Sequence, residues 1–136
     1  MRIAVISVPA RRREIPEYVK SLARGMESLG HRVDIVDAWT EDGFRLPGYE
    51  YIAVCAEAAS SWGGKMPDAL AKVLSSGSGL VGKKSAAFLK KTGPFFVNKA
   101  LCNLMKAMEK EGMLVNWSEI LLNAPQAEAL GKRIGA

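Results

Sequence analysis

The stretch Tyr51-Ile-Ala-Val-Cys-Ala56 decides the fold class, because it is nearly apolar on both faces that a strand presents. Such a strand must be covered from both sides, as the strands of parallel sheets are. Short runs rich in Val and Ile predict two further strands at Arg2–Ser7 and Arg32–Asp37. Lys84–Leu89 is a fourth predicted strand, and Met113–Leu122 contains a fifth. The pattern therefore predicts a five-stranded sheet.

Segments in which apolar residues recur at helical spacing lie between the predicted strands. The expected helices begin near Tyr18, Met66, Leu101 and Pro125, and the first of them ends at Gly30. Its apolar stripe consists of Tyr18, Val19, Leu22, Met26 and Leu29. Strands that alternate with helices favour a doubly wound parallel α/β sheet with helices on both faces and right-handed crossovers. The chain has 136 residues, so we expect a single domain over residues 1–136.

The composition narrows the classes of function. The formal net charge of +5 favours acidic or phosphorylated partners, but no nucleic-acid-binding motif is present and we expect no nucleic-acid partner. No apolar run approaches the roughly 18–20 residues that span a bilayer, so no membrane contact is expected. Cys55 and Cys102 are too few for a disulfide framework, and we expect both to pack as small apolar residues in a cytoplasmic protein. A lone histidine, His31, predicts no metal site.

Three loops are expected to converge where ligands bind to open α/β sheets, beyond the carboxyl ends of the strands. They are residues 8–16, 57–66 and 90–97. No Walker sequence and no nucleophile-elbow motif occurs, so no catalytic residue is assigned. The sequence therefore directs attention to binding groups in these loops.

The middle loop, Glu57-Ala-Ala-Ser-Ser-Trp-Gly-Gly-Lys-Met66, is the most distinctive of the three. In one interpretation Trp62 stacks on a flat ring while Gly63 and Gly64 let the backbone approach it closely. In the other, Trp62 packs over the sheet edge and the glycines only turn the chain. Glu57 is the one carboxylate close to the expected crevice from this side, either as a polar ligand contact or as a loop charge.

The residues Trp62-Gly-Gly-Lys-Met-Pro67, between a strand and a helix, resemble the flavin-contacting loop of flavodoxin-like proteins and FMN-dependent quinone reductases. Val81-Gly-Lys-Lys-Ser-Ala-Ala-Phe-Leu89 resembles the fourth strand of that family, and Thr92-Gly93 stands where its second flavin loop lies. The resemblance implies a strand order of 2-1-3-4-5 and an FMN cofactor. The residues that it assigns to the flavin ring and its surroundings are Ser60, Trp62, Gly63, Gly64, Thr92 and Gly93.

The first loop departs from that family, whose members surround the FMN phosphate with small residues rich in hydroxyls and glycine. Ser7 is retained, but Pro9 has no N–H and the loop has no glycine. Arg11, Arg12 and Arg13 follow instead. Either Ser7 and one or two of these arginines hold the phosphate by charge, or the arginines form a solvated run and the anion site is lost.

Two functions follow from these alternatives. The first is an FMN-binding redox protein that transfers electrons or reduces a quinone-like acceptor, with an acidic redox partner protein and a homodimer as further expectations. The second is a degenerate flavodoxin-like domain without flavin, which acts as a binding or interaction module for an acidic protein or another phosphorylated small molecule. Phe95 and Phe96 fit both, since they either form a wall of a flavin pocket or fill the space that an absent flavin leaves.

Overall fold

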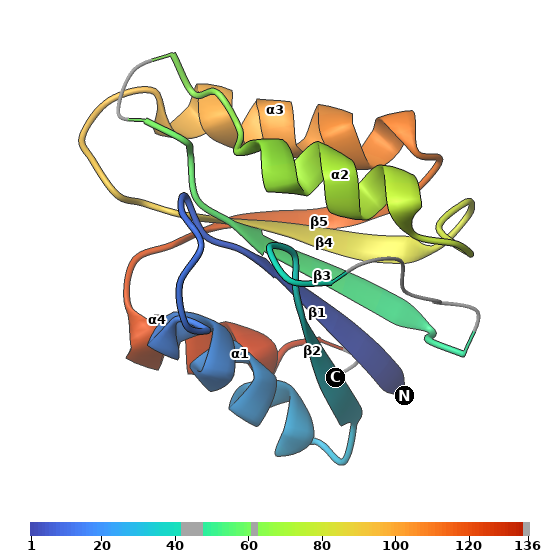
Figure 1. Cartoon of the computed structure of the whole chain (residues 1–136). Helices are drawn as coiled ribbons and strands as arrows, with labels where there is room; N and C mark the ends of the chain where they lie inside the picture. The colour runs from blue at the N-terminus through green and yellow to red at the C-terminus, as the bar shows by residue number, and fades with distance from the viewer. Residues whose placement is uncertain (42–47, 61–62, 135–136) are drawn as a thin grey trace.

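A five-stranded parallel sheet forms the centre of the molecule in the computed structural model, which describes residues 1–41, 48–60 and 63–134 (Figure 1). In the described residues, a helix follows every strand except β2. Within the described ranges, no helix is long and apolar enough to cross a membrane. The elements are β1 Arg2–Val8, α1 Glu17–Glu27, β2 Arg32–Asp37, β3 Tyr51–Ala56, α2 Asp68–Ser76, β4 Lys84–Lys90, α3 Val97–Lys110, β5 Leu114–Leu121 and α4 Ala124–Gly131.

The strands are arranged in the order β2-β1-β3-β4-β5, and every neighbouring pair is parallel. The fold class predicted from the sequence, a doubly wound sheet in the order 2-1-3-4-5, is therefore confirmed. The predicted bounds of Arg32–Asp37 and Tyr51–Ala56 coincide with β2 and β3. The pairing of β4 with β5 has an irregularity between Ser85 and Ala86.

Helices cover both faces of the sheet, as predicted (Figure 1). Alternate side chains of β1 point to opposite faces, so Ile3 and Val5 pack beneath α1 and α4, while Ala4 and Ile6 pack beneath α2 and α3. On the first face, α1 and α4 contribute five buried large apolar or aromatic side chains, and on the second, α2 and α3 also contribute five buried ones. These are Tyr18, Val19, Leu22, Met26 and Leu130, and then Leu70, Val73, Leu74, Leu104 and Met108.

Two apolar residues lie outside the core that their sequence pattern predicted. Leu29 follows the end of α1 and is 43% exposed. Cys102 is exposed, so the expectation that it packs inside is wrong, whereas Cys55 is fully buried in β3 as expected. The reason for Cys102 is helical geometry, because a position two residues before the buried Leu104 lies about 200° around the helix.

Helices α1 and α4 approach each other closely through glycine. A Cβ added to Gly131 of α4 would collide with the backbone carbonyl oxygen of Leu22 in α1, and one added to Gly25 of α1 would collide with that of Glu128 in α4. The absence of two methyl groups therefore sets the distance between these helices.

Candidate functional site

The candidate site lies at the carboxyl edge of the sheet, where the loops that precede the helices gather. In a parallel sheet with helical crossovers, each helix begins beyond the end of its preceding strand. The segments after β1, β3, β4 and β5 therefore meet at this edge, from which α1, α2, α3 and α4 begin. The structure brings the three loops identified from the sequence to this edge.

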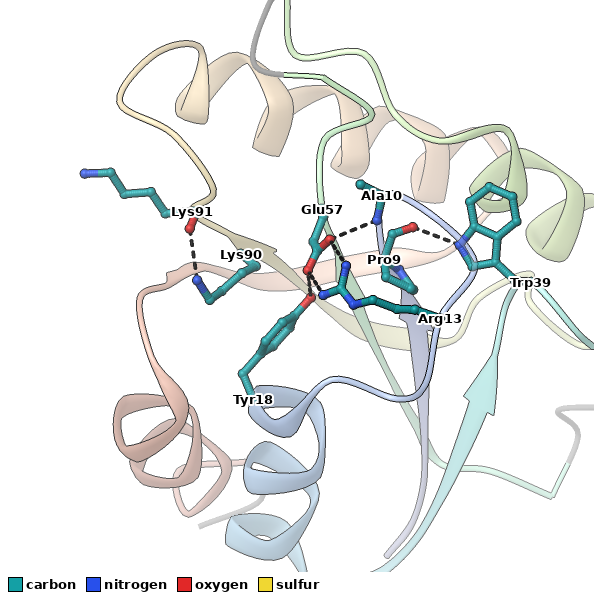
Figure 2. A network of polar contacts seen from close by, with 8 residues as sticks. All are labelled: Pro9, Ala10, Arg13, Tyr18, Trp39, Glu57, Lys90 and Lys91. Atoms are coloured by element: carbon teal, nitrogen blue, oxygen red, sulfur yellow. Dashed lines mark hydrogen bonds and ion pairs between the residues drawn. The ribbon is translucent and has the colours of Figure 1, made fainter.

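The Glu57 carboxylate accepts four hydrogen bonds at this edge of the sheet. Glu57 follows β3 and is only 4% exposed. Its Oε1 accepts hydrogen bonds from the Ala10 N–H at 2.9 Å and from Arg13 Nη1 at 2.9 Å. Its Oε2 accepts from Arg13 Nη2 at 2.6 Å and from the Tyr18 hydroxyl at 2.8 Å (Figure 2). Arg13 thus binds the carboxylate in the bidentate geometry that guanidinium forms with carboxylates and phosphates.

The surroundings of Glu57 keep its carboxylate ionised. Burial alone would raise the pKa of this carboxyl, but the hydrogen bonds from Arg13, Ala10 and Tyr18, together with the positive charge of Arg13, outweigh burial and lower the pKa below its ordinary value of 4.5. Burial, and then the neighbouring Glu57 carboxylate, raises the pKa of the Tyr18 hydroxyl. At neutral pH the carboxylate therefore accepts from a protonated phenol and from a guanidinium.

Hydrogen-bond donors of the first loop, the Ala10 N–H and the Arg13 guanidinium, bind the Glu57 carboxylate of the same chain. Of the three arginines, Arg13 binds Glu57, whereas Arg11 and Arg12 are exposed and form no ion pair within the described part of the chain. The Pro9 carbonyl accepts a hydrogen bond from Trp39 Nε1 at 2.8 Å, which fastens the loop to the end of β2 (Figure 2). The loop that precedes α1 thus holds an anion, and the anion is a side chain of the same protein.

Sequence reasoning identified the participants of this network only in part. It named Arg13 as a candidate phosphate ligand and Glu57 as a ligand contact or loop charge, but it placed Tyr18 in an apolar stripe. The sequence signal for this role is that Tyr18 lies in the first turn of the helix and has a hydroxyl, which a buried tyrosine usually satisfies with a partner. The three hydrogen-bonded positions are 39 to 47 residues away from Glu57 along the chain.

Ser7, the other predicted phosphate ligand, lies within β1 beside Cys55 of β3. It is fully buried, and its Oγ has no hydrogen-bond partner within the described structure. The hydroxyl therefore forms no hydrogen bond with the arginines. Its role toward a phosphate stays a prediction.

Backbone conformation and close packing explain why glycine occupies positions 63 and 64 of the middle loop. Gly63 and Gly64 have φ angles of +75° and +69°, in the left-handed region that favours glycine. A Cβ on Gly64 would press against the backbone of Ala100, and the Asn103 side-chain amide donates to the Gly64 carbonyl at 2.9 Å. The loop is thus fastened to α3. Trp62, the predicted ring-stacking residue, lies outside the described residues.

Four of the residues predicted to contact a flavin line one small cavity. Ser60, Gly64, Thr92 and Gly93 surround it from the loops after β3 and β4. Phe95 and Phe96 also line it but stay 64% and 40% exposed. The cavity measures about 10 Å³, which is room for about one water molecule.

Among the described residues, which exclude Ser61 and Trp62, neither of the two places that the resemblance implies fits FMN. Organic ligands of that size occupy clefts of roughly 300–1,000 Å³, whereas the cavity between Gly64 and Gly93 measures about 10 Å³. At the other end, the Glu57 carboxylate occupies the donors of Ala10 and Arg13 in the loop where the phosphate would bind.

The fold closely resembles those of solved flavodoxins and related reductases. The oxidised flavodoxin 1 from Bacillus cereus superposes with a TM-score of 0.69 over 99% of this chain and 95% of its own, at 16% identity. An NAD(P)H:quinone oxidoreductase from Methanothermobacter marburgensis superposes with a TM-score of 0.63 over 98% of both chains, at 12% identity. A flavone reductase superposes with a TM-score of 0.72 at 12% identity, and the match covers 98% of this chain and 62% of the reductase. No protein-family model and no curated protein sequence matches. At these identities the likeness establishes a flavodoxin-like fold.

Proposed function

We propose that this chain is a flavodoxin-like binding domain that works without FMN and recognises an anionic partner at its carboxyl edge. The observation that carries the proposal is the Glu57 carboxylate, which is held by Arg13, Ala10 and Tyr18 in the first loop. An internal anion at this position stabilises the loop without an external ligand. The fold would then be kept as a scaffold, as folds often are when their functions differ.

Electrostatic repulsion explains why a flavin phosphate would bind poorly here. At an effective dielectric constant of about 20, two unit charges about 5 Å apart repel by roughly 3 kcal/mol, and a phosphate dianion doubles the repulsion. A phosphate at this loop would either approach the ionised Glu57 or displace it from Arg13. Displacement would leave a buried carboxylate and the buried Tyr18 hydroxyl without their partners.

An FMN-dependent oxidoreductase is the second candidate, and one observation favours it. Ser60, Gly64, Thr92 and Gly93 converge on the same cavity, as the resemblance to flavin-binding loops implies. The similar structures include a quinone oxidoreductase and a flavone reductase. This function would require the cavity to widen and the loop of Arg13 to release Glu57.

Titration with FMN separates the two candidates. We expect the fluorescence of FMN to stay unquenched when the purified protein is added at low ionic strength. We also expect the melting temperature of the protein to stay unchanged with about 100 μM FMN, whereas a dissociation constant of about 1 μM would stabilise the folded state by roughly 2.7 kcal/mol. An apoflavodoxin serves as the positive control. Stoichiometric quenching by this chain would reject the proposal in favour of the oxidoreductase.

A further inference from the structure

A groove beside the Glu57 network has the size of a small-ligand site. Its volume is about 690 Å³, within the range of roughly 300–1,000 Å³ that is usual for ligand pockets. It lies between the beginning of α1 and the segments that follow β4 and β5. Lys90, Lys91 and Thr92 form one side, and Leu122 and Asn123 form another. The end of β4 and the segments after β4 and β5 thus form a second candidate site on the α1 and α4 face.

The two lysines of this groove form no ion pair with any carboxylate of the described residues. Within the described residues, no carboxylate oxygen lies within 4.0 Å of Lys90 or Lys91. Lys90 Nζ donates to the Lys91 carbonyl at 3.0 Å and lies 5.7 Å from the centre of the Tyr18 ring (Figure 2). These two contacts hold the Lys90 ammonium group at the groove, next to Tyr18 of the Glu57 network.

The acidic side chains of the groove are already paired. Glu57 binds Arg13, and the exposed Glu17 lies 2.9 Å from Arg24 Nη2. The lining holds three positive side chains, Arg13, Lys90 and Lys91, and two carboxylates, Glu17 and Glu57, so its net charge is positive. The positive ends of the α1 and α4 dipoles add a smaller contribution of the same sign.

Neutral groups around the lysines suit an organic phosphate. Thr92 is exposed and has a hydroxyl that can donate to a phosphate oxygen. Leu122 is 53% exposed and gives the groove an apolar side chain close to these donors. Asn123 Oδ1 is already used as the cap of α4, where it accepts from the Gln126 N–H at 2.9 Å.

We propose that this groove binds a small phosphorylated organic molecule. Lys90, with Lys91 next to it in the lining, supplies positive charge for a phosphate monoester, Thr92 donates a hydrogen bond to it, and Leu122 contacts its organic part. The proposal rests on the proposed function, because it assumes that the first loop is occupied by Glu57. It places the external anion at the segments after β4 and β5 instead.

Phenyl phosphate and inorganic phosphate are the probes for an NMR titration of the ¹⁵N-labelled protein. We expect both to shift the backbone amides of residues 90–92 and 122–124, with phenyl phosphate binding several-fold more tightly because its ring contacts Leu122. The double variant Lys90→Gln/Lys91→Gln should lower the affinity for phenyl phosphate at least tenfold. The variant Thr92→Val removes the hydroxyl at nearly constant volume and should lower the affinity for phenyl phosphate a few-fold.

The matched control is Lys106→Gln/Lys110→Gln, which removes the same charge from exposed positions on α3. This control should change the affinity less than twofold. Equal weakening by both double variants would overturn the proposal, because the effect would then reflect net charge. Amide shifts centred on residues 10–13 would overturn it too, as would binding of an acidic peptide but not of phenyl phosphate. FMN titration followed by the same amide shifts tests the proposed function separately. FMN shifts centred on residues 7–13, 63–64 and 93 would reject the proposed function, whereas failure of phenyl phosphate and inorganic phosphate to bind would reject only the groove.

Discussion

Replacing Glu57 with alanine should lower the free energy of unfolding by about 2–3 kcal/mol at neutral pH. The buried Tyr18 hydroxyl and the Ala10 N–H lose their acceptor, and each such unmade hydrogen bond is costly. Arg13 contributes less, because 46% of its side chain is exposed and water can solvate the released guanidinium. Urea denaturation followed by circular dichroism measures the change.

Two further variants test whether the network causes this loss. Glu57→Gln keeps one acceptor oxygen and should lose less stability than Glu57→Ala. Glu50→Ala removes an exposed carboxylate and should stay within about 0.5 kcal/mol of the wild type. If Glu57→Ala were as stable as Glu50→Ala, the hydrogen bonds to Glu57 would have no energetic importance.

The contribution of Glu57 also has a definite pH dependence. The pKa of its carboxyl in the folded chain is lower than the ordinary value of 4.5 that it has when unfolded. The unfolded chain therefore binds the proton first as the pH falls, and the stabilisation is complete only above about pH 4.5. The stability difference between the wild type and Glu57→Gln should shrink as the pH falls below this value.

Gly131→Ala should destabilise the protein by about 3 kcal/mol, although alanine is the better helix former by about 1 kcal/mol. The added methyl group would collide with the carbonyl oxygen of Leu22, which belongs to the backbone of α1 and cannot rotate away. Relief requires α1 and α4 to separate, and that loosens the core around Leu22 and Leu130. Thermal and urea unfolding measure the loss.

Gly77→Ala provides the control for this substitution. Gly77 follows α2 and has a φ of −75°, which any residue adopts, so the same methyl group adds no backbone strain there. We expect its effect to be within about 0.5 kcal/mol. A Gly131→Ala variant as stable as this control would show that α1 and α4 tolerate a larger separation.

The sheet was predictable because its signals are local. The run Tyr51–Ala56 is apolar throughout, and the strand that it predicts has the same bounds as β3. Alternation of strands and helices then restricts the topology. Cys102 shows the limit of such reasoning, because an apolar residue within a helical segment can lie on its exposed side.

The site was less predictable because its contacts are distant in sequence. Three arginines indicate an anion, and Arg13 does bind one, but nothing in the local sequence identifies that anion as Glu57, 44 residues away. Tyr18 fits an apolar stripe equally well whether or not its hydroxyl has a partner. Gly64 fits both a ligand approach and a close contact with Ala100, and only the packing of the loop on α3 gives it a structural reason.

The acid titration of the Glu57 carboxyl carbon by ¹³C NMR tests the central claim most directly, namely that the first loop holds this carboxylate as its anion. We predict a pKa below 4.5 in the wild type, and a higher pKa in Arg13→Gln, where burial is opposed by fewer interactions. A pKa at or above 4.5 that does not respond to Arg13→Gln would contradict the claim, because the carboxylate would then not be bound by the loop.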